Sequence, residues 1–213
     1  MIHQAKMARL VEDIAARLGV DDRRVIEAVA SVPRHWFVDE ALRLRAYSDD
    51  ALPIGYGQTI SKVSTVLRMT ALLNPQRDEK VLEIGTGSGF QAAVLARLAD
   101  SVYSVERVGA LALRAREMLN RLRAYRVHIR TGDGSKGWAK HAPYDKIIVT
   151  AAADRMPHAL LEQLAHGGLL VTPVEGSGGQ VLKEVRRLDD DNWEEVALES
   201  CRFVPLVEGS TAR

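Results

Sequence analysis

The stretch VLEIGTGSGF, residues 81–90, places four strand-forming residues directly before a glycine-rich turn, and an apolar helical stretch, FQAAVLARLA, begins at its last residue. Strand, turn and helix in this order are typical of a nucleotide-type site in a doubly wound α/β sheet. Gly85, Gly87 and Gly89 allow a sharp turn and let a ligand approach the amino terminus of the helix. For this motif alone, a tight connection that binds nothing is the alternative.

The alternation of strand and helix continues towards the carboxyl end. Short apolar runs at 101–106, 126–130 and 144–152 are separated by turns and helical stretches, and GGLLVTPV is followed by two further strand candidates. Such alternation implies right-handed crossovers and a parallel sheet covered on both faces, with antiparallel pairing at its last edge. The sequence therefore predicts an α/β core over residues 80–213.

The first part of the chain has a different texture. Apolar residues at helical spacing between positions 7 and 18 predict one helix, and a second short helix ends before Pro33 because the residue preceding a proline avoids the α region. Residues 33–61 are irregular. We expect residues 1–60 to form a helical and loop extension that covers the site, within a single domain of residues 1–213.

Composition limits the classes of partner. The chain has 29 basic and 28 acidic residues, so no global field favours nucleic acid or an anionic membrane. It lacks a secretory apolar core and a run of 18 apolar residues, so we expect a cytoplasmic protein with no membrane or nucleic-acid partner.

Cys201 lies in an apolar-alternating stretch, which predicts a buried core thiol. No histidines stand at metal-ligand spacing, so we expect no metal.

Two acidic residues follow later strands. Glu106 stands 21 positions after Gly85, where a carboxylate can accept hydrogen bonds from both ribose hydroxyls, and Asp133 in TGDG could accept from an adenine amino group. The alternatives are an exposed charge paired with Arg107 and an Asp-Gly turn. The glycine spacing is G-x-G-x-G rather than the dinucleotide pattern G-x-G-x-x-G. An adenosine cofactor without a pyrophosphate therefore fits better than NAD, which disfavours an NAD-linked oxidoreductase.

Longer stretches of the chain resemble one family. VPRHWFVDEALRLRAYSDDALPIGYGQTIS, VLEIGTGSGFQAAVLARLA, VYSVER, GDG, APYDKIIVTAAA, GGLLVTPV and RFVPLVEG, in this order, resemble bacterial protein-L-isoaspartate O-methyltransferases. The resemblance implies a class I, Rossmann-like doubly wound fold, with a mostly parallel seven-stranded sheet, an antiparallel edge strand and an N-terminal helical extension. It also implies methyl transfer from S-adenosyl-L-methionine, leaving S-adenosyl-L-homocysteine, to the α-carboxyl of L-isoaspartyl residues, which initiates repair. We expect its partners to be isoaspartyl-containing proteins and peptides. We also expect the protein to be a monomer.

The family's functional residues can be matched position by position. The residues matched to cofactor binding are Glu83, Gly85, Thr86, Gly87, Gly89, Glu106, Asp133 and Gly134. The residues matched to the segment that covers the methionine end and the acceptor are Thr59, Ile60 and Ser61. The resemblance places Ser61 at the active-site serine.

The match fails immediately after Ser61. The family usually continues Ser-Gln-Pro, whereas this chain has Lys62 and Val63, which makes the loop less constrained and restores an amide donor. Lys62 could contact the substrate by pairing with an acid, could repel the sulfonium, or could simply be solvated. Three alternatives therefore stay open: isoaspartyl repair, a different acceptor, or a silent homologue that binds the cofactor.

The predicted chemistry needs no base. A carboxyl acceptor has a pKa of about 4 and is already an anion at neutral pH, so the site must place it and exclude water. We give Ser61 the role of holding a carboxylate oxygen. Its alternative is a helix N-cap that accepts from the N–H of Val63 or Ser64, and both roles can coexist.

A basic run of arginines at 107, 114, 116, 121, 123, 126 and 130 raises RNA as another acceptor, although a solvated helix face explains it better.

Overall fold

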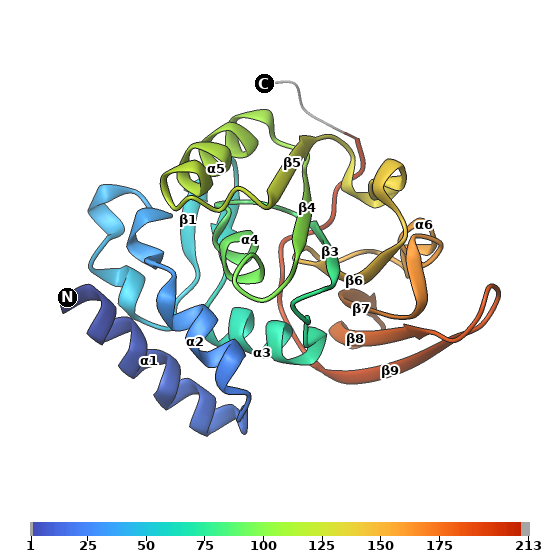
Figure 1. Ribbon diagram of the computed structural model, residues 1–213, viewed down its shortest axis with the longest axis horizontal. Helices are drawn as coiled ribbons and strands as arrows, with labels where there is room; N and C mark the ends of the chain where they lie inside the picture. The colour runs from blue at the N-terminus through green and yellow to red at the C-terminus, as the bar shows by residue number, and fades with distance from the viewer. Residues whose placement is uncertain (1, 210–213) are drawn as a thin grey trace.

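A seven-stranded sheet runs through the computed structural model, which describes residues 2–209 (Figure 1). Its strands are β3 Lys80–Ile84, β4 Ser101–Glu106, β5 Val127–Thr131, β6 Tyr144–Val149, β7 Leu164–Gly176, β8 Gly179–Arg187 and β9 Trp193–Ser200. Their order across the sheet is β5-β4-β3-β6-β7-β8-β9. The pairs from β5 to β7 are parallel, whereas β8 runs antiparallel to β7 and β9. The mostly parallel sheet with antiparallel pairing at one edge is confirmed.

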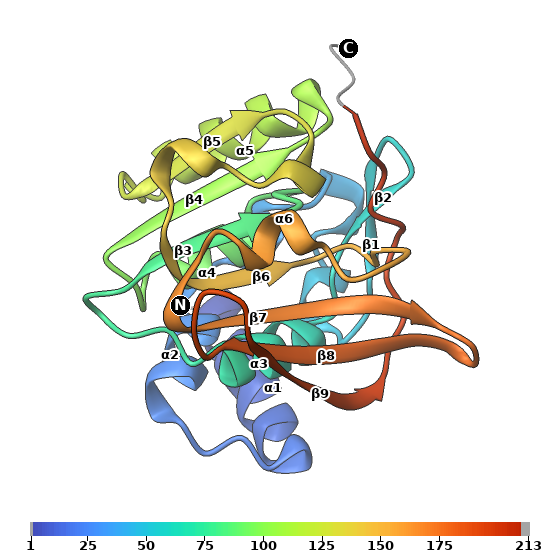
Figure 2. The same ribbon diagram turned by 90° about the vertical axis from the view of Figure 1, so that its right-hand side faces the viewer.

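Helices cover both faces of the sheet. α3 Val63–Leu73, α4 Phe90–Leu95 and α5 Gly109–Arg121 lie on one face, where Val81 and Ile148 join the buried core. The short helix α6, His158–Leu161, and the 3-10 turns Gly134–Lys136 and Ala139–His141 lie on the other. Figure 2 shows β7, β8 and β9 running side by side at one edge. The helical stretch expected between β6 and β7 is shorter than its sequence suggests, because the chain enters β7 at Leu164.

Two helices form a further layer outside α3 and α4. α1 spans Ile2–Leu18 and α2 spans Arg23–Ser31, and their apolar faces share one core cluster with α3, α4 and α5. The carboxylate of Asp22 caps α2 by accepting from the N–H of Arg24 at 2.9 Å. The N-terminal helical extension is confirmed. None of the helices formed by residues 2–209 is both long and apolar enough to cross a membrane.

The segment predicted to be irregular contains a β-hairpin. After the 3-10 turns Arg34–Trp36, Glu40–Leu42 and Arg45–Tyr47, the strands β1 Leu52–Gly55 and β2 Gln58–Ile60 pair antiparallel. Tyr56 and Gly57 connect them with φ values of 56° and 68°. Two consecutive residues with positive φ give the twist that a two-residue hairpin loop needs. The hairpin delivers Ser61 to the start of α3.

A buried guanidinium holds this segment in place. Arg34 is 0% exposed, and its Nη1 donates to the carbonyl oxygens of Ala46 and Ser48 at 3.0 and 3.3 Å. Its Nη2 donates to those of Asp50 and Ser61 at 2.7 and 2.8 Å. Burial lowers the pKa of Arg34 to about 10, so the group is still charged at neutral pH. One side chain thereby fixes four backbone positions around the entrance to α3.

The thiol of Cys201 is less buried than the sequence predicts. It lies just after β9 at the margin of the core, where it is half-buried and packs against one of the buried clusters. Partial burial still raises the pKa of the thiol to about 11. The prediction of a fully buried core thiol is wrong, because the strand pattern ends at Ser200 and the chain leaves the sheet.

Replacing Arg34 tests the importance of these four hydrogen bonds. We expect Arg34→Lys to lower the free energy of unfolding by about 2–4 kcal/mol, because an ammonium cannot reach four carbonyls and leaves buried acceptors unpaired. Arg43→Lys, at an exposed ion pair with Glu40, is the matched control and should change stability by less than about 0.5 kcal/mol. Urea unfolding measures the free energy of unfolding of both variants. Equal losses for Arg34→Lys and Arg43→Lys would show that the four buried hydrogen bonds are not critical for stability.

Candidate active site

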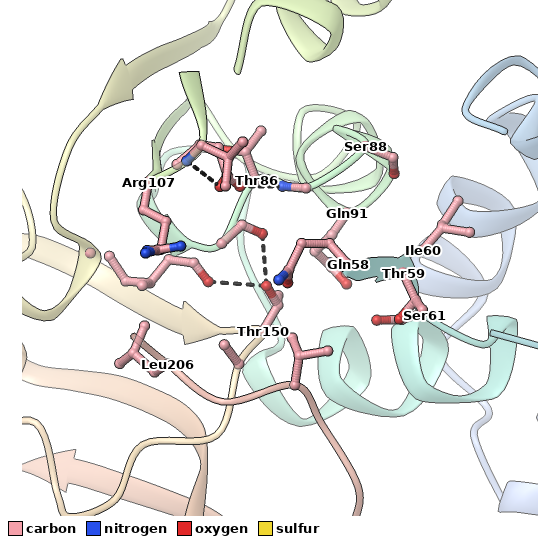
Figure 3. Close-up of a pocket in the computed structure, with 18 of the residues that line it drawn as sticks. Gln58, Thr59, Ile60, Ser61, Thr86, Ser88, Gln91, Arg107, Thr150 and Leu206 are labelled. Carbon is pink, nitrogen blue, oxygen red and sulfur yellow. Dashed lines mark hydrogen bonds between the residues drawn. The ribbon is translucent and has the colours of Figure 1, made fainter. Parts of the chain in front are cut away.

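A cavity lies where β3, β4 and β6 end, as expected for the ligand site of a parallel sheet. Its walls come from the glycine turn, the end of β2, the first turns of α3 and the segment 204–207 that follows β9. Figure 3 shows Arg107 and Leu206 towards one end of the cavity and Ile60 and Ser61 towards the other, with Thr150 between them. The long axis of the cavity therefore connects the end of β4 to the hairpin.

The glycine turn is shaped by a close backbone approach. Gly85 has a φ of 93°, and a Cβ there would lie 2.5 Å from Oγ1 of Thr150, which donates to the Gly85 carbonyl at 2.7 Å. Gly85, Thr86 and Gly87 all line the cavity, as predicted for cofactor contact. Gly89 does not line it. That residue starts α4 with a φ of 88°, and a Cβ would come within 3.2 Å of Cβ of Ala115, so it permits α4 to pack on α5.

Glu106 braces the turn from the neighbouring strand. Its Oε2 accepts from the N–H of Gly87 at 2.7 Å and its Oε1 from the N–H of Val108 at 2.9 Å. The residue is 5% exposed and lines the cavity, so the alternative of an exposed strand-end charge is wrong. Each carboxylate oxygen keeps a further acceptor position. The site thus offers a buried anion that can receive two hydroxyl groups.

Glu83 lies beneath the cavity rather than in its wall. It is 0% exposed, and the Ser104 hydroxyl donates to its Oε2. The same Ser104 hydroxyl lies 2.5 Å from Oγ1 of Thr86, so a buried chain of three polar groups connects Glu83 to the turn. Burial raises the pKa of Glu83 to about 8, with a smaller contribution from the charge of Glu106. Glu83 therefore supports the turn through Ser104.

Only one of the two residues predicted for the adenine end lines the cavity. Gly134 does so, and it must be small because a Cβ would lie 2.5 Å from Cγ2 of Ile84. Asp133 caps the 3-10 turn instead, with Oδ1 accepting from the N–H and the hydroxyl of Ser135 at 3.0 and 2.7 Å. A contact between Asp133 and an adenine stays a prediction.

Ser61 is not the cap of α3. The N-cap position is occupied by Lys62, whose side chain makes no cap hydrogen bond, and Oδ1 of Asp49 accepts from the N–H of Ser64 at 2.8 Å. The alternative role predicted for Ser61 is therefore wrong. Its hydroxyl has no hydrogen-bond partner among residues 2–209 and lines the cavity, while Arg34 holds its carbonyl.

The other residues predicted to contact the acceptor separate into two groups. Thr59 and Ile60 line the cavity beside Ser61, although Ile60 is only 3% exposed and serves as wall. Lys62 faces an adjoining second cavity. Val204 borders both cavities, held by a hydrogen bond from the Ala152 N–H to its carbonyl at 2.8 Å.

Sequence reasoning missed several residues of the wall: Gln58, Gln91, Thr150 and Leu206. Thr150 follows β6, whose carboxyl end lies next to that of β3, so its place in the strand pattern was a usable signal. Leu206 comes after the last strand. Its N–H donates to the Ala152 carbonyl at 2.6 Å, and this hydrogen bond holds the segment beside the cavity. In the part of the chain that the structure describes, His, Cys, Asp and Glu form no cluster suited to a metal ion.

Several arginines of the basic run hold backbone in place. Arg114 donates to the Ile54 carbonyl at 3.1 Å, Arg116 to that of Ile129 at 3.0 Å and Arg130 to that of Gly137 at 2.8 Å. Arg114 also pairs with Asp39 at 3.1 Å. These groups are partly committed to the fold, which weakens the case for a phosphate-binding face.

The chain is similar to proteins of one known family. Residues 5–211 match the family described as Protein-L-isoaspartate(D-aspartate) O-methyltransferase (PCMT). The chain belongs to this family. Protein-L-isoaspartate O-methyltransferase of Halorhodospira halophila is 54% identical over 210 residues, covering 98% of this chain and 94% of the relative. That of Geobacter metallireducens is 53% identical over 199 residues, covering 93% and 92%.

Solved structures share the fold. One protein-L-isoaspartate O-methyltransferase is 26% identical with a TM-score of 0.84, covering 93% of this chain and 65% of that one. A Plasmodium falciparum protein, provisionally named for the same activity and solved in complex with S-adenosyl-L-homocysteine, is 24% identical with a TM-score of 0.83, covering 96% and 98%. The resemblance seen in the sequence is confirmed, and this family of methyltransferases leaves the NAD-linked alternative without support.

The buried carboxyl of Glu83 predicts a pH dependence of stability. Its pKa rises from 4.5 to about 8 on folding, so between these values the folded state holds a proton that the unfolded state lacks. Stability should then fall as pH rises through this window, by up to about 1.4 kcal/mol per pH unit. Glu83→Gln should flatten the profile, whereas exposed Glu117→Gln should leave it unchanged. Urea unfolding at a series of pH values measures the dependence of stability on pH. Parallel profiles of stability against pH for Glu83→Gln and wild type would contradict the raised pKa of Glu83.

Proposed function

We propose that this protein transfers a methyl group from S-adenosyl-L-methionine to the α-carboxyl of L-isoaspartyl residues in damaged proteins and peptides, initiating their repair. Family membership over nearly the whole chain supports the activity. The observation that carries it is the position of Ser61. Its hydroxyl lies where the cavity bounded by the glycine turn and Glu106 meets a second, adjoining cavity, so donor and acceptor can meet there.

The residues of the first cavity suit the chemistry of the cofactor. We propose that Glu106 accepts the ribose hydroxyls, that the turn from Gly85 to Gly87 lies against the amino-acid part, and that Gly134 borders the adenine. When bound, the cofactor supplies an electrophilic methyl group on a sulfonium. The free space is about 90 Å³, below the range of about 300–1,000 Å³ typical of ligand pockets, so we propose that side chains of the wall, among them Gln58 and Arg107, rearrange when the cofactor binds.

The chain's own groups then have to position an anion. An isoaspartyl α-carboxylate is ionised at neutral pH, so no residue needs to remove a proton from it. We propose that the Ser61 hydroxyl donates to one carboxylate oxygen and leaves the other for the methyl group. Arg34 fixes the backbone of Ser61, and Thr59 and Ile60 help to exclude water. Rigid placement supplies the catalysis.

The domain organisation, the partners, the oligomeric state and the location of the protein belong to the same proposal. We take residues 1–213 as one domain, in which residues 1–60 cover the site and residues 80–213 hold the cofactor. We propose isoaspartyl-containing proteins and peptides as its partners, a monomeric state and a cytoplasmic location. The replacement of the family's usual residues by Lys62 and Val63 favours one runner-up, a methyltransferase with a different acceptor.

The decisive experiment uses labelled S-adenosyl-L-methionine and two short peptides that differ only in carrying L-isoaspartate or L-aspartate at one position. We expect a base-labile methyl ester on the isoaspartyl peptide alone. Transfer to neither peptide, with the cofactor still bound in calorimetry, would overturn the proposed acceptor and favour the runner-up or a silent homologue.

Variants at the two ends of the cavity separate its roles. Ser61→Ala should lower kcat about 10–100-fold, because it removes a hydrogen bond to a charged group, and should change the Kd for S-adenosylhomocysteine less than about threefold. Glu106→Gln should raise that Kd about 10–100-fold. Exposed Ser177→Ala is the control and should match wild type. Steady-state kinetics and calorimetry measure these effects, and the reverse pattern would mean that the roles are exchanged.

A further inference from the structure

A second cavity of about 490 Å³ opens beside the first. It lies between α3 and the chain that follows β9, and the two cavities share Thr59, Ser61, Thr65, Met69, Thr150 and Val204. Ser61 therefore borders both spaces. If the proposed function holds, the second cavity is where the residues next to an isoaspartyl acceptor must lie.

The charges around this second cavity are uneven. Lys62, Arg68 and Arg202 line it, and Glu199 is the single acid among the described residues of its wall. Glu199 is already engaged, because Nε of Arg68 donates to it at 3.2 Å. Lys62 and Arg202 form no ion pair with any residue in the range 2–209, and both are exposed. Within residues 2–209, two cations at the cavity are thus left without an ion-pair partner.

Two acids near the start of α3 are committed elsewhere. Asp50 is close enough to Lys62 for that lysine to contribute, as a minor cause, to the lowered pKa of Asp50, but its carboxylate accepts from the Ser48 hydroxyl at 2.9 Å and pairs with Arg45 at 3.5 Å. Asp49 pairs with Arg17. Asp49 and Asp50 therefore do not cancel the positive charge of Lys62.

The remaining wall suits a peptide rather than a small anion. Leu182 and Phe203 provide apolar surface, while Ser64, Thr65 and Ser200 provide hydroxyls. An isoaspartyl residue contributes only the α-carboxylate that is to be methylated, which the proposed function assigns to Ser61. A second negative charge can then come only from a neighbouring side chain or from a chain terminus.

We propose that Lys62 and Arg202 form a specificity site for an acidic side chain of the substrate, so that isoaspartyl segments with flanking Asp or Glu are preferred. The proposal rests on the proposed function and names its substrate class more closely. Exposed ion pairs are each weak, so the two cations act mainly on selection between peptides, by favouring acidic neighbours and repelling basic ones.

The test is a set of isoaspartyl peptides that carry Glu, Gln or Lys at each position from two before to three after the acceptor. At low salt, kcat/KM should be about tenfold higher for Glu than for Lys at one or two of these positions, and about 0.5 M salt should reduce the ratio to about twofold. Arg202→Gln and Lys62→Gln should each lower the low-salt ratio to about threefold. The double variant should bring it close to unity.

Lys140→Gln is the matched control, because it removes the same charge from an exposed position outside the cavity and should keep the full ratio. Melting temperature and binding of S-adenosylhomocysteine verify that each variant is folded. A wild-type ratio near unity at every position would overturn the proposal. So would a Lys62→Gln variant that keeps the ratio but loses kcat on the Gln peptides, since Lys62 would then act on the reacting carboxylate. Failure of wild type on every isoaspartyl peptide would instead overturn the proposed function.

Discussion

The buried guanidinium of Arg34 is the constraint on which the hairpin end of the cavity depends. A charge taken out of water is costly unless hydrogen bonds compensate for it, and here four backbone carbonyls accept from Nη1 and Nη2, although Nε has no partner among the described residues. Because those carbonyls come from the single segment 46–50 and from Ser61, the segment cannot shift independently of the serine. The N-terminal extension thus fixes the backbone that carries the Ser61 hydroxyl without contributing that hydroxyl itself.

On the cofactor side, polar groups of neighbouring strands perform the equivalent task. Glu106 fixes Gly87 from β4, and Thr150 fixes Gly85 from β6, so the turn after β3 is held from both sides. Glu83 supports it from below through Ser104. Preorganised turns of this kind bind a ligand with little loss of conformational entropy.

The sequence predicted those features whose signals are local. The glycine turn, Glu106 and the strand alternation lie within short windows, and the structure agrees with them. Arg34 and Ser104 were beyond reach, because Arg34 acts on a partner 27 positions away and Ser104 on one 18 positions away. The hairpin was missed because Tyr56 adopts a positive φ that its residue type does not announce. The N-cap that was the alternative role for Ser61 is replaced by a contact from Asp49, which lies 15 positions from Ser64 and gives no local signal.

The segment 204–207 has a bearing on biosynthesis. It borders the first cavity, and through Val204 also the second, and its backbone is tied to Ala152. A ribosome delivers these residues only after the last strand of the sheet. A nascent chain therefore lacks part of the wall of both cavities until translation has passed this segment.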